Sequence, residues 1–261
     1  MPEGDTLFRT AAGLRPYLVG RDVIAARAQG PGPVPQVQRV IGQRIVTVDA
    51  QGKNLLIRFD GGLELRTHLR MNGSWHRYRP GERWRRPPGR ARLVLEVDGS
   101  VAVCFDAPVV ELFETRAERV HPTLARLGPD LLSPDVDLEE ARRRLRDPAR
   151  RDVSISAALL DQRALAGIGN IWRNETLWAE RVSPFATVGS LDDVTLERLV
   201  ATARRLLVAS ASIAPGRASP AVYRRAGRPC PRCGAAIRSA PAGPAVARTT
   251  YWCPACQGGT P

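Results

Sequence analysis

The sequence predicts an α+β protein in which an antiparallel β domain comes first and a helical domain follows. Near the N-terminus, apolar residues recur at helical spacing: Leu7, Ala11, Leu14 and Leu18. Between residues 37 and 106 the pattern changes to short β-branched runs separated by Gly-containing turns, which is typical of hairpins. After residue 134, segments of helical length take over. At 261 residues the chain is long enough for two domains with separate cores.

The first helix is expected to open the chain. Pro2 suits a helix start because the N–H that proline lacks has no partner there, and Glu3 and Asp5 favour the positive end of the helix dipole. Pro16 is expected to kink or end this helix, since a proline inside a helix removes a backbone hydrogen bond.

Five strands are expected in the β domain, at residues 44–48, 54–59, 63–69, 92–97 and 101–105. Asp-Gly turns at 60–62 and 98–100 separate neighbouring runs and indicate antiparallel hairpins, arranged as either a sandwich or a barrel. Residues 77–92 hold seven arginines among aromatic residues, prolines and glycines. This stretch is expected to be an exposed loop whose charges are either simply solvated or in contact with nucleic acid.

Gly-Pro at 128–129 and Ser-Pro at 133–134 place a domain junction at residues 119–134. Helices are then expected at residues 138–145, 155–165, 171–179 and 191–208. Ser154 and Ser190 are candidate N-caps, because a serine side chain can accept a hydrogen bond from first-turn amides. The expected parts of the chain are the β domain, the linker, the helical domain and a cysteine-containing segment, at residues 1–118, 119–134, 135–228 and 229–261.

Four of the five cysteines form two Cys-x-x-Cys pairs, Cys230 with Cys233 and Cys253 with Cys256, and 19 residues separate the pairs. This spacing predicts one structural Zn²⁺ in a zinc ribbon, because each turn supplies two thiolates and two turns complete a tetrahedron. Two disulfides, the alternative, fit an intracellular chain poorly. The fifth cysteine, Cys104, lies in an apolar run and is expected to be a buried, inert thiol.

The chain carries 39 basic and 26 acidic residues, which gives a net charge of +13. Such a charge favours a polyanionic partner. Nucleic acid fits better than a membrane surface, because the sequence has no basic amphipathic anchor and no apolar span. Glu3 and Asp5 stand where a signal peptide would carry positive charge, and no apolar segment follows them. A soluble, intracellular protein is therefore expected.

Lys53 is the only lysine among the 39 basic residues, the other 38 being arginine. Lysine can lose its proton and presents a compact ammonium, whereas arginine keeps its charge. Lys53 is therefore a candidate for chemistry that needs a nucleophile, a transferable proton or a point charge. The alternative is that one lysine has survived a compositional bias by chance.

Pro2 offers a different nucleophile. If Met1 is removed, Pro2 becomes a terminal secondary amine, with an unperturbed pKa of about 8 against about 10.4 for lysine. The positive end of the helix would lower that pKa further and so raise the fraction of free base. Condensation with an aldehyde-like carbon would give an iminium that cannot lose its charge, and Glu3 stands beside it to move protons. The alternative is an ordinary helix start without chemistry.

Taken together, these features show that the chain resembles the formamidopyrimidine-DNA glycosylase and endonuclease VIII family of base-excision repair enzymes. The resemblance spans nearly the whole chain, and its motifs occur in the family's order. They are Pro2-Glu3-Gly4, Gly52-Lys53, residues 68–73, His121-Pro122, residues 127–129, residues 161–175 and residues 248–254. The resemblance implies a β-sandwich domain, a helical domain with a helix–two-turn–helix at 161–175, and a zinc ribbon. It also implies removal of a damaged base followed by strand cleavage through β,δ-elimination.

On this resemblance, Pro2 would attack the sugar carbon that carries the damaged base. Glu3 would transfer protons as the sugar opens, and Lys53 would lie beside the sugar and its phosphate. Asn170 and Arg248 would hold the phosphates that flank the lesion. Arg248 suits this role because a guanidinium binds phosphate bidentately.

Residues 68–73 are the other DNA-contacting segment that the resemblance implies. Met71 would fill the space left by the flipped nucleotide, as apolar side chains commonly do, although a methionine filling a gap in the core is the alternative. Arg70 stands beside it. His68 would contact a phosphate or support this loop, with a purely structural role as the alternative.

One departure from the family pattern bears on the substrate. Purine-specific members carry an Arg-Phe pair in a later loop of the first domain, whereas residues 106–111 (Asp-Ala-Pro-Val-Val-Glu) hold neither. This favours the endonuclease VIII branch and oxidised pyrimidines. The alternatives are a glycosylase specific for 8-oxoguanine and formamidopyrimidine, and a non-catalytic zinc protein that binds damaged DNA. The expected partner is damaged double-stranded DNA, bound by a cytoplasmic, nucleoid-associated monomer without membrane contact.

Overall fold

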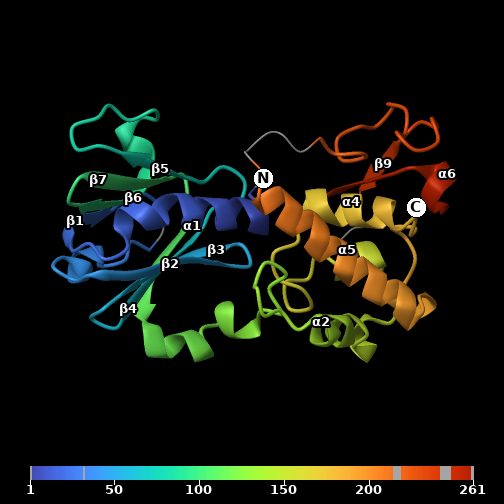
Figure 1. The fold of residues 1–261 in the computed structure, drawn as a ribbon, viewed down its shortest axis with the longest axis horizontal. Helices are drawn as coiled ribbons and strands as arrows, with labels where there is room; N and C mark the ends of the chain where they lie inside the picture. The colour runs from blue at the N-terminus through green and yellow to red at the C-terminus, as the bar shows by residue number, and fades with distance from the viewer. Residues whose placement is uncertain (1, 32, 214–218, 242–247, 260–261) are drawn as a thin grey trace. The chain divides into compact units, whose positions relative to one another are not determined.

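The computed structural model of the protein describes residues 2–31, 33–213, 219–241 and 248–259. The chain divides into two units, Met1–Ala125 and Arg126–Pro261 (Figure 1). The helix and strands of the N-terminal unit are α1 (Gly4–Leu18), β1 (Val23–Ala28), β2 (Ile45–Gln51), β3 (Asn54–Phe59), β4 (Leu63–His68), β5 (Ser74–Tyr78), β6 (Ala91–Val97), β7 (Ser100–Phe105) and β8 (Val109–Glu114). Those of the C-terminal unit are α2 (Leu138–Leu145), α3 (Ile155–Ala158), α4 (Asn170–Ala179), α5 (Asp193–Ala211), β9 (Arg238–Pro241), β10 (Thr249–Trp252) and α6 (Pro254–Gln257).

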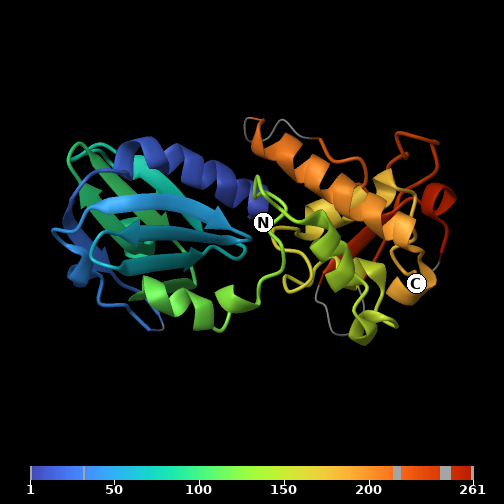
Figure 2. The ribbon, with the colours of Figure 1, turned by 60° about the horizontal axis from the view of Figure 1, so that its bottom comes forward.

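The strands of the N-terminal unit form two antiparallel sheets, in the orders β1-β6-β7-β5 and β2-β3-β4-β8 (Figure 2). Apolar side chains from both sheets and from α1 enclose one core. The predicted stripe of α1 is buried in this core: Leu7, Ala11, Leu14 and Leu18. Of the two arrangements that the strand pattern left open, the structure therefore shows the sandwich.

Three strands, β1, β5 and β8, are absent from the set expected from the sequence. The half-buried β5 (Ser-Trp-His-Arg-Tyr) pairs with β7, so its extended conformation comes from this neighbour and not from β-branched residues. The loop expected at 77–92 accordingly begins only after Tyr78. Pro16 does not end α1 at once: it lacks only the N–H that would bind the carbonyl of Ala12, and the helix runs on to Leu18.

The remainder of the arginine-rich stretch, residues 79–90, folds over the face of β5, β6 and β7 that points away from the main core. Trp84 stacks on Tyr78 with 6.1 Å between ring centroids and meets Phe105 edge-on at 5.7 Å. The Tyr78 hydroxyl accepts the N–H of Arg85 at 3.1 Å. The exposed arginines of this loop therefore stand on an ordered aromatic support: Arg79, Arg83, Arg85 and Arg90.

In the C-terminal unit, α2 to α5 and their connections enclose a second core. Ser154 caps α3 as predicted, accepting a first-turn N–H at 3.3 Å. The helix expected at 155–165 is wrong beyond Ala158, because side chains there support turns instead. Asp161 accepts the N–H of Arg163 at 2.9 Å, and Gln162 accepts the N–H of Gly167 at 3.2 Å.

The N-cap predicted for the last long helix is also wrong. Asp192, not Ser190, caps α5 and accepts the N–H of Thr195 at 2.8 Å. The Ser190 hydroxyl instead donates to the carbonyl of Thr187 at 2.8 Å. A carboxylate is favoured at this position because it also interacts with the helix dipole.

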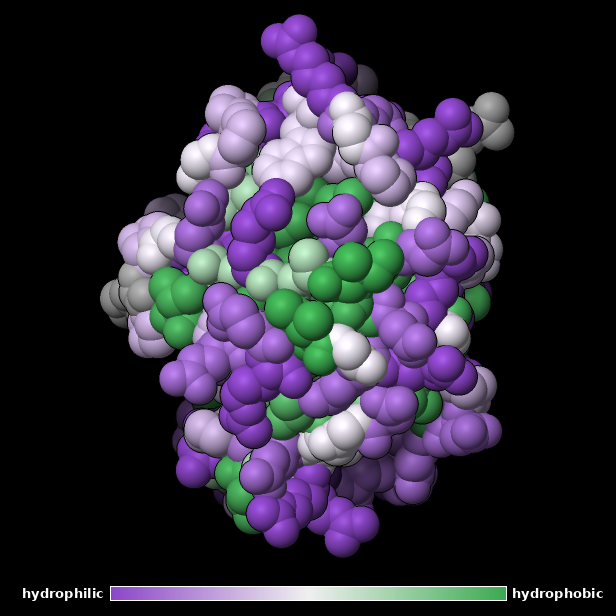
Figure 3. Space-filling model, turned by 90° about the vertical axis from the view of Figure 1, so that its left-hand side faces the viewer, coloured by the Kyte–Doolittle hydropathy of each residue, from purple (hydrophilic) through white to green (hydrophobic). Residues whose placement is uncertain are grey.

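Figure 3 shows an end face of the N-terminal unit on which hydrophobic side chains gather among hydrophilic ones. The unit's exposed large apolar residues include Ile24, Ile41 and Val46. Cys104 is fully buried in β7, as predicted, and this burial raises the pKa of its thiol. Among the described residues, none of the helices has the length and apolar character needed to cross a membrane.

Candidate active site and nucleic-acid interface

Two hydrogen bonds set the direction of α1 along the neighbouring strand β2. The N–H of Gly20, just after the helix, donates to the carbonyl of Ile45 at 2.8 Å. One turn and a half earlier, Nη2 of Arg15 donates to the carbonyl of Val48 at 2.9 Å. Moving back along α1 thus corresponds to moving forward along β2, and the two elements run antiparallel.

The start of α1 therefore converges with the loop that joins β2 to β3. The path from Arg15 back to the first residue of the helix covers about 17 Å at the helical rise, and the path from Val48 to Lys53 covers about 17 Å at the strand rise. Both segments lie at the same end of the unit in Figures 1 and 2. Pro2 is half-buried there and Glu3 is buried. Three residues predicted to carry chemistry thus belong to one end of the sandwich.

The hairpin loop that carries Lys53 is held by its neighbours. Gly52 has a φ of 58°, a left-handed conformation that favours glycine in a two-residue hairpin loop. Nδ2 of Asn54 donates to the carbonyl of Gln51 at 3.0 Å, and the buried Arg66 donates from Nε to Oδ1 of Asn54 at 2.9 Å. Arg66 and Asn54 therefore fix the position of Lys53, and no motif in the sequence marks them.

His68 ends β4 and is paired in register with Asn54, next to the Lys53 loop. Burial, together with the positive charges of Arg66, Lys53 and Arg70, lowers the pKa of His68 to about 4. The neutral ring accepts the N–H of Arg70 at Nδ1 across 3.2 Å. His68 thus supports the turn that follows it, and a contact with phosphate stays a prediction.

The turn after His68 presents Met71 to solvent. Met71 is 60% exposed, so it does not fill a gap in the core of this unit. Arg70 has a φ of 46°, and the N–H of Gly73 closes the turn on the carbonyl of Leu69 at 2.9 Å. A Cβ on Gly73 would lie 2.6 Å from that carbonyl oxygen, so the turn requires glycine. Met71 is therefore held outward by a tight turn.

In the C-terminal unit, Asn170 and Arg248 come together through Thr249. Asn170 is the first residue of α4, and its Nδ2 donates to the carbonyl of Thr249, the residue after Arg248, at 3.1 Å. Within the described parts of the chain, Oδ1 of Asn170 and Nη1 of Arg248 are buried without a hydrogen-bond partner. Buried polar atoms normally have partners, and a helix start attracts anions. The donor Nη1 of Arg248 therefore suits an anionic ligand, whereas Oδ1 of Asn170 is an acceptor and would need a donor group.

Glu175, on the same helix, has a role that the sequence patterns do not predict. Its buried carboxylate accepts the N–H groups of Ala221, Val222 and Tyr223 at 2.7, 3.0 and 2.9 Å. These bonds fasten the segment that precedes the cysteines to α4. No signal in the sequence marks this role, because Glu175 stands among other polar residues of the helix, with Asn174 and Thr176 beside it.

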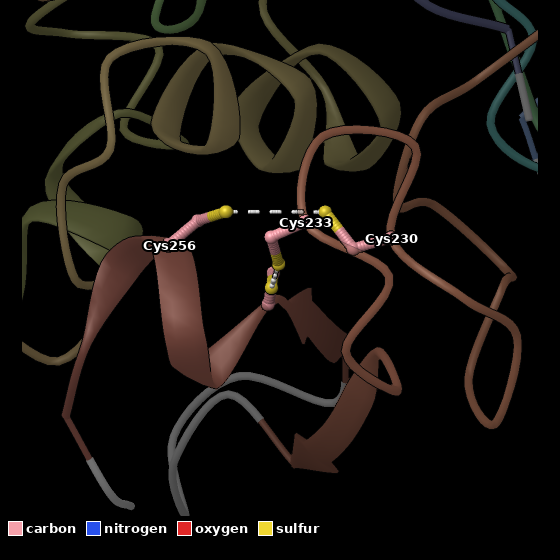
Figure 4. Close-up of side chains that lie close together, drawn as sticks. Cys230, Cys233 and Cys256 are labelled. Atoms are coloured by element: carbon pink, nitrogen blue, oxygen red, sulfur yellow. Dashed lines mark hydrogen bonds between the residues drawn. The ribbon is translucent and has the colours of Figure 1, made fainter.

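The four cysteines of the two pairs form one cluster (Figure 4). Their Sγ atoms all lie within 4.8 Å of one another. Sγ of Cys230 is 3.9 Å from that of Cys256, and Sγ of Cys233 is 3.4 Å from that of Cys253. Four thiolates around Zn²⁺ at about 2.3 Å would be about 3.8 Å apart, so the cluster fits a tetrahedral metal ion.

The cysteine cluster is joined to the end of α4 by Trp178 and Arg232. Nε1 of Trp178 donates to Sγ of Cys230 at 3.4 Å. Arg232 lies over the Trp178 ring, 4.2 Å from its centroid, and donates to the carbonyls of Trp178 and Ala179 at 2.9 and 3.2 Å. Burial would raise the pKa of Cys230, but the bonds from Trp178 and from the Arg232 amide help to lower it to about 6. These bonds favour the thiolate of Cys230, the form that binds metal, whereas burial raises the pKa of Cys253 to about 12.

Comparisons with known proteins agree with this arrangement. Residues 1–108 match the family model of the formamidopyrimidine-DNA glycosylase N-terminal domain, and residues 127–219 match that of the formamidopyrimidine-DNA glycosylase H2TH domain. A protein of Streptomyces coelicolor named probable endonuclease 8 2 is 40% identical over 99% of this chain and 95% of its own length. The chain belongs to the formamidopyrimidine-DNA glycosylase and endonuclease VIII family.

Two further members of this family bear on the activity and the fold. The DNA-(apurinic or apyrimidinic site) lyase Nei2 of Mycolicibacterium smegmatis is 37% identical over 98% of this chain and 99% of its own length. The Fpg protein of Lactococcus lactis, solved in complex with DNA containing an abasic site, superposes with a TM-score of 0.85. It is 22% identical over 98% of this chain and all of its own. The predicted family and its fold are thus confirmed.

Proposed function

We propose that the protein is a bifunctional DNA glycosylase and abasic-site lyase that removes oxidised bases, pyrimidines in preference to purines, from double-stranded DNA. Membership of the family supports this activity, and so do relatives named endonuclease 8 and DNA-(apurinic or apyrimidinic site) lyase. One observation carries the proposal. The convergence of the α1 start with the hairpin loop brings Pro2, Glu3 and the chain's only lysine, Lys53, to one end of the sandwich.

In the proposed reaction, the free amine of Pro2 attacks C1′ of the damaged nucleotide. A C–N bond forms there as the bond to the base breaks, and the base leaves with a proton. Glu3 gives a proton to the ring oxygen as the sugar opens, and Lys53 supplies a transferable proton or a point charge beside the sugar. The iminium then draws electrons from C2′, which loses a proton as the 3′ phosphate departs, and a second elimination releases the 5′ phosphate.

DNA would be held separately by each unit. In the N-terminal unit, Met71 is presented by a fixed turn and would fill the space left by the flipped nucleotide, with His68 and Arg70 beside it. In the C-terminal unit, the unpartnered donor Nη1 of Arg248 and the position of Asn170 at the start of α4 support binding of phosphates next to the lesion.

The preference for pyrimidines rests on the segment 106–111. Its two charged side chains are already engaged: Asp106 is paired with Arg86 and Arg90, and Glu111 is paired with Arg66. The remaining side chains are small or aliphatic. This segment therefore supplies no cationic or aromatic wedge of the kind that purine-specific members carry.

The metal is proposed to be one structural Zn²⁺ bound by Cys230, Cys233, Cys253 and Cys256. Bound there, it would fix the hairpin of β9 and β10 and with it Arg248. We further propose a monomer that acts in the cytoplasm at the nucleoid, and a division of the C-terminal unit into a helical part and a zinc ribbon at residues 228 and 229.

Borohydride trapping tests the reaction. The protein is incubated with a duplex containing an abasic site, and reduction of the iminium should give a covalent adduct that matches Pro2 in a peptide map. One extra residue before Pro2 should abolish the adduct, whereas a Lys53 nucleophile would still be trapped. Met1 lies outside the described residues, so intact mass must first establish that it has been removed. Salt-dependent DNA binding without any adduct or incision would instead identify a non-catalytic DNA-binding protein.

A further inference from the structure

Three loops meet beside the turn that presents Met71. Residues 69–73 lead into β5, which pairs with β7 from Ser74 and Phe105 onward. Asp106 directly follows β7, and the arginine-rich loop 79–90 comes back to the same sheet before β6. Strand register therefore brings together three segments that lie far apart in the sequence.

Arg86 connects these loops. Its Nη1 donates to the carbonyl of Asn72 at 3.3 Å and to Oδ2 of Asp106 at 2.5 Å. Arg90 donates from Nε to the other oxygen of Asp106, Oδ1, at 2.8 Å. Asn72 is the residue directly after Met71, so the guanidinium of Arg86 holds the turn at the peptide between residues 72 and 73.

Asp106 is itself fixed in place. It has a φ of 53°, an unusual conformation for a residue with a side chain, and its N–H donates to the carbonyl of Arg90 at 3.0 Å. The hydrogen bonds from Arg90 and Arg86 lower its pKa, so its charge persists into acidic solution. Asp106 can therefore act as a permanent anchor for Arg86.

We propose that Arg86, anchored by Asp106, is a positioning residue that orders the Met71 turn before DNA binds. This inference rests on the proposed function, in which Met71 enters the duplex. A side chain that must hold open a gap in the base stack loses less conformational entropy if its turn is already ordered. The bonds within the turn set its shape, and Arg86 ties that shape to the sheet. Nη1 of Arg86 is already bound to Asp106 and to the carbonyl of Asn72, so the role is support and not capture of phosphate.

The test compares base removal with strand cleavage in single turnovers. One duplex carries thymine glycol beside 2-aminopurine, and a second carries a preformed abasic site. Arg86→Ala should slow base removal and the 2-aminopurine signal of insertion by about tenfold, the scale of one charged hydrogen bond. Cleavage of the abasic duplex should stay within about twofold, because a nucleotide without a base leaves the stack easily.

Arg85→Ala is the matched control, since it removes the same charge from an exposed neighbour whose backbone, and not its side chain, contacts Tyr78. Arg86→Lys should recover part of the rate, because an ammonium can also donate to both acceptors. Arg86→Ala added to Met71→Ala should cost nothing further, since the two act as one unit. If Arg86→Ala fails to fold, Asp106→Asn releases Arg86 and replaces it in the test.

The outcomes separate this inference from the proposed function. Loss of both reactions to the same extent, or additive effects of Arg86→Ala and Met71→Ala, would overturn the positioning role. A salt dependence of DNA binding that falls by about one unit in Arg86→Ala would overturn it as well, by showing direct phosphate contact. If the unaltered protein gives no borohydride adduct, or Met71→Ala removes base at the normal rate, it is the proposed function that fails.

Discussion

The indole Nε1 of Trp178 donates to Sγ of Cys230 across 3.4 Å, so the last turn of α4 contributes to the environment of the cysteine cluster. Trp178→Phe keeps an aromatic ring beneath Arg232 but removes the donor. We expect metal to be bound about tenfold more weakly, because partners of metal ligands commonly contribute that much. Competition with a chromogenic chelator measures this loss, and the thiolate-to-metal absorption of the cobalt form should shift. Trp84→Phe, in the other unit, is the control, and unchanged metal retention in Trp178→Phe would contradict the role.

Replacement of Glu175 should loosen the segment that precedes the cysteines. Glu175→Gln sets an NH₂ group against backbone N–H donors and loses at least one charge-assisted bond, each worth about 1.5–3 kcal/mol. Hydrogen exchange at the amides of Ala221, Val222 and Tyr223 should accelerate accordingly. The exposed Glu197→Gln is the control for charge. Unchanged protection of the three amides would show that the carboxylate is dispensable.

The low pKa of His68 makes stability depend on pH. In the unfolded chain this histidine takes up a proton below about pH 6.5, whereas in the folded protein it does so only near pH 4. The free energy of unfolding should therefore fall, by about 1.4 kcal/mol per pH unit from this group, as the pH drops from 6.5 to 4. Urea denaturation of the unaltered protein and of His68→Asn at several pH values isolates the contribution of His68 to the free energy of unfolding. An NMR titration of His68 with a midpoint near 6.5 would rule it out.

Lys53→Arg should separate binding from chemistry. The variant keeps the positive charge, so affinity for damaged duplex should change little, but a guanidinium cannot give up a proton. We expect base removal to slow at least a hundredfold, the usual range for loss of a proton-transferring group. Fluorescence anisotropy measures the affinity, and single-turnover kinetics measure base removal. Lys53→Met also lacks the positive charge and should lose both affinity and base removal. Full activity in Lys53→Arg would leave the single lysine as an accident of composition.

The fold could be predicted where it depends on residues close together in the sequence. The apolar stripe of α1 lies in the core of the N-terminal unit at helical spacing, and alternate apolar residues of β3 and β7 lie in the same core. The spacing of the cysteines predicts their cluster in a similar way, because each Cys-x-x-Cys turn is a local structure that presents two thiols together. Local patterns do not predict strands whose conformation depends on a neighbouring strand. β5 is an example, because its residues are extended through pairing with β7.

The residues that support the site could not be read from the sequence because their partners lie far along the chain. Arg66 reaches Asn54 only through the register of β3 and β4, and Glu175 binds amides 46 to 48 residues away. The contacts of Arg86 with Asn72 and Asp106 likewise depend on the pairing of β5 with β7. The division of the C-terminal unit at residues 228 and 229, and the roles given to the motif residues, stay predictions until they are tested.

The position of Lys53 on the loop between β2 and β3 makes amine labelling of this protein a probe of one location. A reagent that acylates amines finds one lysine side chain besides the chain terminus, and that side chain belongs to the end of the sandwich at which α1 starts. A fluorophore or mass tag could thus be installed there without mutation. Protection from that tag by bound DNA would give a footprint of the site from a single peptide.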